Sequence, residues 1–110
     1  MKLPSGETAY VSPPKLVNYL LSPSHPVGGP KARFFRSVGF DETNAAALEQ
    51  ALIDIARSED VTEVEQTRHG TKDAVEGDLR TPVKGVRRIR TIWIVDVGQE
   101  RPRFVTAYPL

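Results

Sequence analysis

Apolar residues recur at helical spacing in the first half of the chain and at strand spacing in the second half. The clearest stripe is formed by Leu48, Leu52 and Ile55, which lie at i, i+4 and i+7 and predict one apolar helix face. We expect Asp41 or Thr43 to cap this helix. The predicted helices span Lys15–Leu21, Pro30–Val38 and Asn44–Ser58.

Four strands are predicted in the second half, separated by short turns that contain Gly or Pro. They span Val61–Arg68, Lys72–Arg80, Val86–Val97 and Arg103–Tyr108. The third strand is apolar on both faces around Ile92, Trp93 and Ile94, which is typical of a central strand covered on both sides. Short turns join antiparallel neighbours. The sequence therefore predicts an α+β fold in which N-terminal helices pack on one face of a four-stranded antiparallel meander sheet.

Composition is typical of a soluble protein that forms one compact domain. The 110 residues are 39% hydrophobic and 26% charged, which is ordinary for a globular chain. Cysteine is absent, which excludes disulfides and thiol chemistry. No apolar run follows the first residues, so we expect neither a signal peptide nor a membrane span. The prediction is a single cytoplasmic domain over residues 1–110.

The net charge of +1 hides an uneven distribution of acids and bases. Residues 41–65 hold eight acids against one base, whereas residues 80–103 hold seven bases against two acids. We therefore expect one acidic and one basic side. A basic surface suits RNA or a phosphate ligand, although many basic patches are only solvated strand edges. RNA is accordingly a candidate partner.

The segment from His25 to Phe35 places a titratable side chain just before a glycine pair that opens a basic helix. Pro30 suits the first turn of a helix, and the glycines allow backbone amides to approach a ligand closely. Free amides at a helix N-terminus favour a phosphate or carboxylate. The residues predicted to bind it are Gly28, Gly29, Lys31 and Arg33. The alternative is a simple Gly-Pro turn without a ligand.

Strand alternation places further candidates on the sheet. Arg88 and Arg90 share one face of the third strand, and Arg87 lies on the other. Thr106 and Tyr108 lie together on the last strand, where hydroxyls beside an arginine would form a cradle for phosphate. The alternative is that Tyr108 is a core aromatic residue and Thr106 an ordinary strand residue.

Signatures of metal sites and of common nucleophiles do not occur in the chain. His25 and His69 are the only histidines, and no His or carboxylate pair has the spacing of metal ligands. Neither a Gly-x-Ser-x-Gly elbow nor a P-loop is present. We therefore expect no metal and no cofactor.

Metal-independent RNA cleavage needs only ordinary side chains. A base removes the 2′-hydroxyl proton, cations stabilise the phosphoryl oxygens, and an acid protonates the departing 5′-oxygen. The reference pKa of a histidine lies near neutrality, so His25 is the candidate base or acid. His69 is a weaker candidate because it lies in a predicted turn. The predicted catalytic residues are His25, Lys31, Arg90, Thr106 and Tyr108. Predicted RNA or phosphate contacts are Gly28, Gly29, Arg33, Arg87 and Arg88.

Several stretches of the chain resemble the small bacterial proteins grouped as domain of unknown function 6883. They are Lys15-Leu16, Tyr19-Leu20-Leu21, His25–Phe40, Trp93-Ile94-Val95 and Pro102–Pro109. The resemblance covers nearly the whole chain and implies no particular activity. Because members of this group occur beside small β-rich proteins that look like antitoxins, it implies a small acidic antitoxin or immunity-type partner.

A looser similarity is to the barnase, endoU, colicin D and RelE-like group of ribonuclease toxins. These toxins place N-terminal helices ahead of a four-stranded antiparallel sheet, and many end in a strand resembling Val105–Pro109. The similarity implies a metal-independent toxin that cleaves RNA by transesterification. This chain departs from the group because no complete catalytic set matches residue by residue. The alternative is a non-catalytic module that binds RNA, phosphate or a protein.

Overall fold

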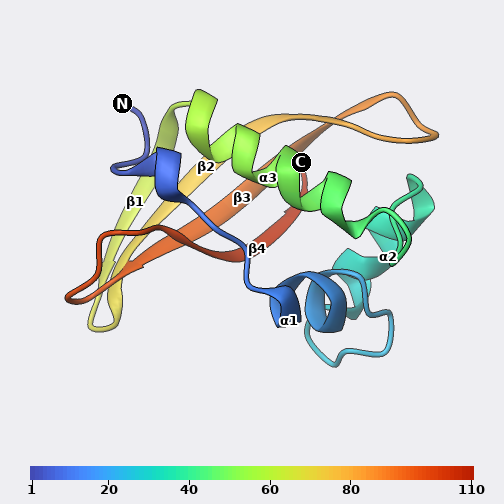
Figure 1. Ribbon diagram of the computed structural model, residues 1–110, viewed down its shortest axis with the longest axis horizontal. Helices are drawn as coiled ribbons and strands as arrows, with labels where there is room; N and C mark the ends of the chain where they lie inside the picture. Colours follow the sequence, from blue (N-terminus) through green and yellow to red (C-terminus); the bar gives the residue numbers. More distant parts are fainter.

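The structure, a computed structural model, describes residues 1–110 and confirms the predicted α+β fold (Figure 1). The helical elements are η1 (Gly6–Thr8), α1 (Pro13–Lys15), the π-helical η2 (Leu16–Leu20), α2 (Gly29–Ser37) and α3 (Ala45–Ser58). The strands are β1 (Val61–Thr67), β2 (Gly70–Arg80), β3 (Val86–Asp96) and β4 (Arg103–Pro109). None of the helices combines the length and the apolar character that crossing a membrane requires.

The sheet is a meander in the order β1-β2-β3-β4, and each neighbouring pair is antiparallel, as predicted. A register shift between Ile92 and Trp93 marks a bulge in the pairing of β3 with β4. Before this bulge along β3, Arg90 lies opposite Tyr108 and Ile92 lies opposite Thr106. Side chains opposite each other share a face, so these four point to the same side of the sheet.

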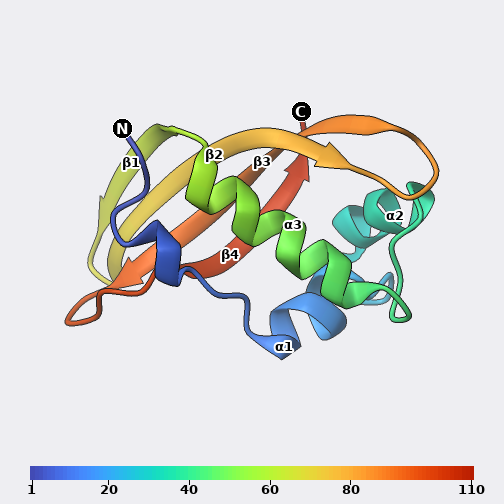
Figure 2. The same cartoon turned by 45° about the horizontal axis from the view of Figure 1, so that its top comes forward.

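Helix α3 covers one face of the sheet (Figures 1 and 2). Its predicted apolar stripe is confirmed, because Leu48 and Leu52 are fully buried and Ile55 is nearly so. The helix packs tightly on β2 at Gly77, where an added Cβ would lie 2.9 Å from the Ile55 side chain. We call the opposite side of the sheet the outward face.

The side of β3 and β4 that faces α3 carries the largest buried side chains. Trp93 and Phe104 are fully buried, with ring centroids 5.4 Å apart in an edge-to-face arrangement. The Trp93 indole N–H donates to Thr91 Oγ1 over 2.8 Å, and the Thr91 hydroxyl donates to the Val75 carbonyl over 2.7 Å. Leaving such buried groups without partners costs about 1–3 kcal/mol each. The sheet is therefore a well-anchored support for its outward side chains.

The elements α1, η2 and α2 form a lobe beside β4 (Figures 1 and 2). Leu20, Leu21 and Phe35 are fully buried in the core that the lobe shares with α3. From the same lobe, Tyr19 forms a hydrogen bond with Thr106 on the outward face of β4. The lobe and the outward face thus meet along β4.

The sequence predicts that β3 is covered on both sides, but helix α3 packs against one side of the sheet only (Figures 1 and 2). On the outward face Ile92 is half-buried and lines an open pocket. Ile94 is buried, although its cross-strand neighbours there are Lys72 and Arg103. The aliphatic stems of Lys and Arg cover apolar neighbours while the charged ends stay in water, so a second layer of helices is not needed.

The predicted cap of α3 is also wrong. Asn44 is the N-cap residue, and no side chain bonds the first turn. Asn44 instead donates to the Gly39 carbonyl over 2.9 Å and accepts from the Asp41 amide over 2.8 Å. The Asp41 carboxylate accepts from the amide of Thr43 over 2.8 Å. These polar residues therefore order the loop that precedes the helix.

Candidate active site

Tyr19 lies at the centre of a cluster of polar side chains where the lobe meets the outward face of β4. Its hydroxyl is 2.8 Å from Thr106 Oγ1 and accepts a hydrogen bond from Lys31 Nζ over 3.1 Å. Lys31 Nζ is also 6.0 Å from the centroid of the Tyr108 ring. We call Tyr19, Lys31, Thr106 and Tyr108 the Tyr19 cluster. It unites three residues predicted from the sequence with one that was not.

Lys31 is the cation of the Tyr19 cluster. It forms no ion pair with any carboxylate of the chain. Helix α2 holds it in place because the neighbouring Ala32 and Phe35 are fully buried. An ammonium group whose hydrogen-bond partner is a hydroxyl keeps its charge available for an anion. Lys31 is therefore suited to hold a phosphate.

The Tyr19 phenol is more acidic than an ordinary tyrosine. Burial alone would raise its pKa, but the hydrogen bonds with Thr106 and Lys31 and the charges of Lys31 and Lys15 lower the pKa below its usual value. Each of these interactions favours the phenolate over the phenol. A phenol with a lowered pKa beside a lysine is suited to proton transfer.

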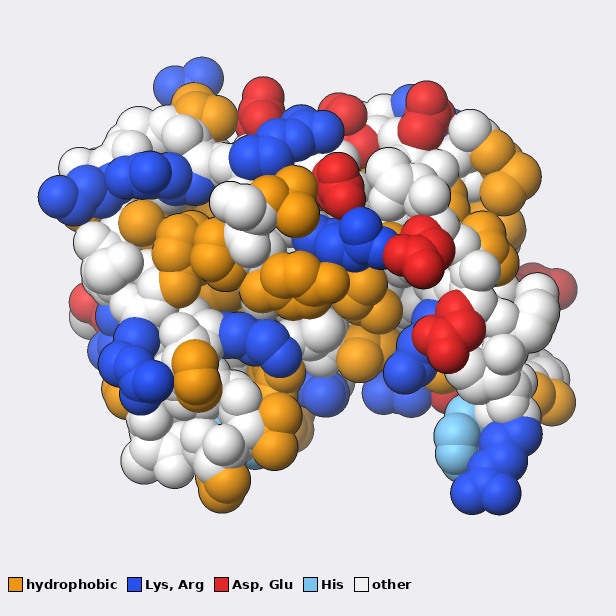
Figure 3. All heavy atoms as spheres, turned by 180° about the vertical axis from the view of Figure 1, so that it is seen from behind, with side chains coloured by type: hydrophobic (Ala, Val, Ile, Leu, Met, Phe, Trp, Pro, Cys, Tyr) orange, Lys and Arg blue, Asp and Glu red, His pale blue; other side chains and the backbone are white.

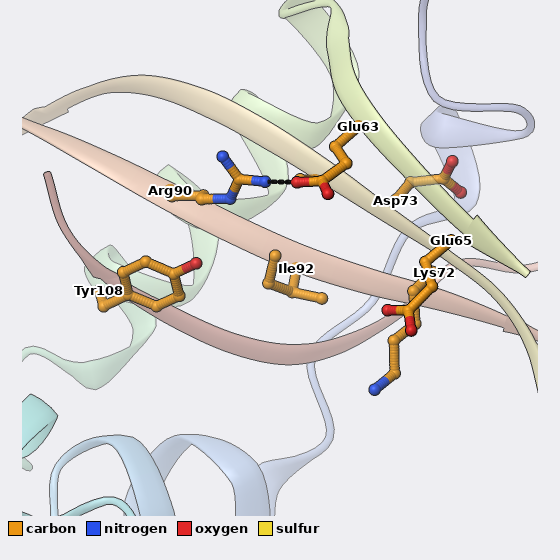
Figure 4. A pocket seen from close by; sticks show the side chains of 8 residues that line it. Glu63, Glu65, Lys72, Asp73, Arg90, Ile92 and Tyr108 are labelled. Carbon is orange, nitrogen blue, oxygen red and sulfur yellow. Dashed lines mark hydrogen bonds and ion pairs between the residues drawn. The ribbon is translucent and has the colours of Figure 1, made fainter. Parts of the chain in front are cut away.

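Arg90 lies on β3 opposite Tyr108, and Glu63 holds it on its other side (Figure 4). Its guanidinium pairs with Glu76 on β2 at 2.8 Å and with Glu63 on β1. Burial would lower the pKa of Arg90, but Tyr108, Glu63 and Glu76 raise the pKa above its usual value. The charge is therefore fixed in place and largely compensated within the fold.

His25 lies beside the Tyr19 cluster, with its ring edge-on to Tyr19 and the ring centroids 5.1 Å apart. Its Nδ1 accepts hydrogen bonds from the backbone amides of Val27 and Gly28, both over 3.0 Å. In the neutral ring the proton is then on Nε2. The imidazole thus caps the turn before α2 and directs an N–H away from it. His69 is exposed in the turn between β1 and β2.

Gly28 and Gly29 allow other parts of the lobe to pack closely against the start of α2. An added Cβ would lie 2.6 Å from the Tyr19 carbonyl oxygen at Gly28, and 2.7 Å from the Pro23 carbonyl oxygen at Gly29. Both amides already donate to His25, one to Nδ1 over 3.0 Å and the other to the carbonyl oxygen over 2.9 Å. The structure therefore commits these two amides to the fold.

The remaining predicted phosphate contacts do not join the Tyr19 cluster. Arg33 is exposed on α2, and its position two residues after Lys31 places it on a different side of that helix. Arg87 is exposed on the α3 side of β3, and Arg88 pairs with Asp78 at 3.2 Å. Nor does any group of three His, Asp or Glu side chains lie close enough together to hold a metal ion.

The predicted division into an acidic and a basic side is not found on the outward face. Arg88, Arg90 and Arg103 pair with carboxylates on neighbouring strands. Figure 3 shows acidic and basic side chains side by side in the half of this face toward the β1–β2 hairpin, whereas Lys and Arg predominate in the other half. The arginine-rich sequence of β3 therefore does not produce an uninterrupted basic surface.

Tyr19 is the site residue that the sequence analysis missed. It stands in the apolar run Tyr19-Leu20-Leu21 and is only 9% exposed, so the local pattern assigns it to the core. One signal is Lys15, four residues earlier, whose Nζ lies 4.4 Å from the centroid of the Tyr19 ring. A basic and an aromatic residue at this spacing share one side of a helical turn.

Comparisons with known proteins provide a family and a fold. The family profile of a domain of unknown function, DUF6883, matches residues 2–110 and confirms the predicted resemblance. One chain from the structure of a contact-dependent growth inhibition toxin–immunity protein complex from Klebsiella pneumoniae 342 has a TM-score of 0.71 and 17% sequence identity, and the match covers 94% of this chain and 95% of that chain. No curated protein matches the sequence. Identity this low shows a common fold alone.

Proposed function

The chain belongs to the DUF6883 family, and we propose that it is a metal-independent ribonuclease toxin domain that cleaves RNA by transesterification. The observation that carries this proposal is the hydrogen-bonded set of Lys31, Tyr19 and Thr106 on an exposed sheet face. A cation among hydroxyl groups supplies the charge and the proton transfer that the reaction needs. The fold shared with a chain of a toxin–immunity protein complex supports a toxin-like role.

In the proposed reaction Tyr19 and Lys31 divide the two proton transfers between them. The Tyr19 phenolate takes the 2′-hydroxyl proton while the 2′-oxygen forms a bond to phosphorus. The bond between phosphorus and the 5′-oxygen breaks, and this oxygen takes a proton from the Lys31 ammonium. The products carry a 2′,3′-cyclic phosphate and a 5′-hydroxyl. The cycle closes when the Tyr19 hydroxyl returns a proton to the Lys31 amine across their 3.1 Å hydrogen bond.

The other predicted residues act on the phosphate or on the position of these two groups. Thr106 and Tyr108 present hydroxyls on the same face of β4, where they donate to the phosphoryl oxygens as negative charge grows there. Arg90 contributes a fixed guanidinium beside Tyr108. His25 closes the turn before α2 and packs against the Tyr19 ring, so it orients the lobe side of the cluster.

The direct test is cleavage of RNA by the wild type and by Tyr19→Phe in the presence of EDTA. Loss of the proton acceptor should lower the rate by about 100-fold or more. Tyr10→Phe is the matched control because the Tyr10 ring packs under Arg101, and it should keep the wild-type rate. The fragments should end in a 2′,3′-cyclic phosphate and a 5′-hydroxyl.

The pH profile separates a tyrosine base from a histidine base. A rate that depends on the Tyr19 phenolate rises with pH until the pH reaches the Tyr19 pKa. A rate that depends on a neutral histidine base would instead level off near neutrality, where the reference pKa of a histidine lies. A plateau near neutrality, with Tyr19→Phe still active, would assign the proton transfer to His25 instead.

Intact RNA with soluble wild-type protein would overturn the ribonuclease proposal and favour a non-catalytic RNA-binding module. One observation favours that alternative: the Tyr19 hydroxyl and the Arg90 guanidinium already have partners within the fold. In such a module the same contacts only hold the lobe against the sheet. Tyr19→Phe would then bind RNA as the wild type does, and neither protein would cleave it.

A small acidic immunity-type protein that neutralises the toxin is part of the same proposal. The similarity to one chain of a toxin–immunity protein complex supports it, and an acidic surface would complement the unpaired Lys31. The test is induced expression in a bacterial host, with Lys31→Met as the inactive control. We expect growth arrest with the wild type alone. Normal growth in spite of soluble wild-type protein would contradict a toxin role.

A further inference from the structure

A second pocket opens on the other side of the Tyr19 ring, between the lobe and the start of β4. It encloses about 410 Å³. Its polar lining consists of Ser12, Lys15, Asn18, Tyr19, His25 and Arg103. We call it the Lys15 pocket. Lys15 and His25, which both pack against the Tyr19 ring, line this pocket, whereas Lys31 and Thr106 do not.

The Lys15 pocket is basic, and no carboxylate lines it. Lys15 forms no ion pair and lies over the Tyr19 ring, with Nζ 4.4 Å from the centroid. Arg103 donates through Nε and Nη2 to Asp96 over 3.1 and 3.0 Å, which leaves Nη1 for another acceptor. A pocket with this lining attracts anions and does not attract cations.

His25 adds a directed hydrogen-bond donor to this lining. Because its Nδ1 accepts from the amides of Val27 and Gly28, the neutral ring presents an Nε2–H group. The backbone thereby fixes both the tautomer and the orientation of the ring. The pocket also offers the Asn18 amide, which can donate two further hydrogen bonds. Donors on α1, η2, the following loop and β4 thus converge.

We propose that the Lys15 pocket binds a backbone phosphate of the RNA strand, next to the phosphate that is cleaved in the Tyr19 cluster. Lys15, His25 and Arg103 donate to its oxygens. Tyr19 forms a wall of the pocket and also a part of the cluster, so a strand that runs along β4 passes both. Such contacts set the register of a nucleic acid without reading its bases. The RNA part of this proposal rests on the proposed function, whereas phosphate binding rests on the pocket itself.

The first experiment measures phosphate binding without any cleavage. Inorganic phosphate is titrated into the wild-type protein, and the backbone amide shifts of Ser12, Asn18 and Val27 are followed by NMR. We expect saturable shifts at these positions, and the same titration of Lys15→Gln should show binding that is weaker by about 10-fold. Absence of saturable shifts at the pocket overturns the proposal, whatever the protein does to RNA.

Two substitutions at one position test the role of His25. In His25→Asn the side-chain oxygen still caps the amides of Val27 and Gly28, but the outward donor is lost. In His25→Gln an outward amide donor is retained and the cap is lost. Binding of a 2′-O-methyl RNA oligonucleotide, which cannot undergo transesterification, should weaken more in His25→Asn than in His25→Gln. The reverse order would mean that His25 acts only through the fold, and would remove it from the site.

The same oligonucleotide separates the pocket from general electrostatic attraction. Lys15→Gln should weaken its binding by about 10-fold and make the binding less dependent on salt. Lys84→Gln, which removes an exposed lysine from the β2–β3 turn, should change binding by less than about 2-fold. Equal effects of the two variants would overturn the pocket as a phosphate site. Tighter binding of poly-glutamate than of the oligonucleotide would also overturn the proposal, because the natural ligand of the pocket would then be an acidic protein.

The outcomes distinguish this proposal from the ribonuclease proposal. Saturable phosphate binding at the pocket without RNA cleavage supports an anion site and contradicts the nuclease. RNA cleavage by a wild type whose Lys15 and His25 variants bind the oligonucleotide unchanged supports the nuclease and overturns the pocket.

Discussion

The two sides of the outward sheet face hold their cations in different ways. Beside β4, Lys31 is bonded to the Tyr19 hydroxyl and pairs with no carboxylate. Toward β1 and β2, Arg90 is held by Glu63 (Figure 4) and by Glu76. Two cations on one surface therefore differ in what they offer to a ligand. The neighbours of a cation decide whether its charge is available.

Two pockets on this side of the molecule differ in the charge of the side chains that line them. A pocket of about 180 Å³ lies beside Arg90, and its charged lining consists of Glu63, Glu65, Lys72, Asp73 and Arg90. Glu63 and Glu65 offset Arg90 and Lys72, and Asp73 lies opposite the buried Trp93, so this pocket has no excess positive charge to attract a phosphate. On the lobe side, Lys31 and Lys15 form no ion pair, and Arg103, which pairs with Asp96, keeps Nη1 free. An anionic strand is therefore expected along β4 and not in the hollow between β1 and β3.

Replacing one lysine on each side gives the largest expected difference. Lys31→Met should lower RNA cleavage by about 100-fold or more, because it removes both a proton donor and the charge that stabilises the phosphoryl oxygens. Lys72→Met removes a half-exposed lysine on the β2 side and should change the rate by less than about 3-fold. Initial rates on one RNA substrate provide the comparison. Similar losses in both variants would mean that the two sides act as one basic surface.

The sequence predicts the fold well because the spacing of apolar residues along the chain determines which segments form helices and which form strands. The stripe of Leu48, Leu52 and Ile55 and the alternation around Trp93 both describe contacts of the element with one buried side. The site could not be predicted in the same way. The Tyr19 hydroxyl meets Thr106 across 87 positions of the chain, and no helical or strand period carries that information.

The same limit applies to the charges and to the glycines. The arginines of β3 read as a basic run, but Arg90 finds its acids on β1 and β2 only when the strands pair in register. Gly28 reads as a ligand loop, whereas the structure uses its missing side chain to pack against Tyr19. The sequence draws attention to both Arg90 and Gly28, but only the structure shows which neighbour each of them contacts.

Stability measurements test the paired side without any activity assay. Arg90→Met leaves the half-buried Glu76 without its partner and should lower the free energy of unfolding by about 1 kcal/mol. Arg88→Met, from the exposed pair with Asp78, should lower it by less than about 0.5 kcal/mol. Urea unfolding followed by Trp93 fluorescence measures both. Equal values would show that Arg90 is no more firmly held than a surface arginine.

Asp73 lies on the same strand as Glu76 but pairs with no cation. It is 3% exposed, and burial raises the pKa of its carboxyl with no hydrogen bond or ion pair to oppose the shift. The folded protein therefore binds this proton more tightly than the unfolded chain does. Protonated Asp73 therefore favours the folded state. This contribution to the free energy of unfolding is fully present below the unfolded pKa of about 3.9, and it is lost as the pH rises through the folded pKa.

Asp73→Asn should remove this loss because the amide carries no charge to bury. We expect the variant to be more stable than the wild type by about 1 kcal/mol at neutral pH and the difference to shrink as the pH falls toward the usual pKa of an aspartate. Urea unfolding at several pH values measures it, and Glu76→Gln is the matched control. Glu76 is paired with Arg90, so its amide variant should lose stability at neutral pH. A shift of stability in the same direction in both amide variants would contradict this prediction. It would mean that the paired Glu76 and the unpaired Asp73 lie in equivalent environments.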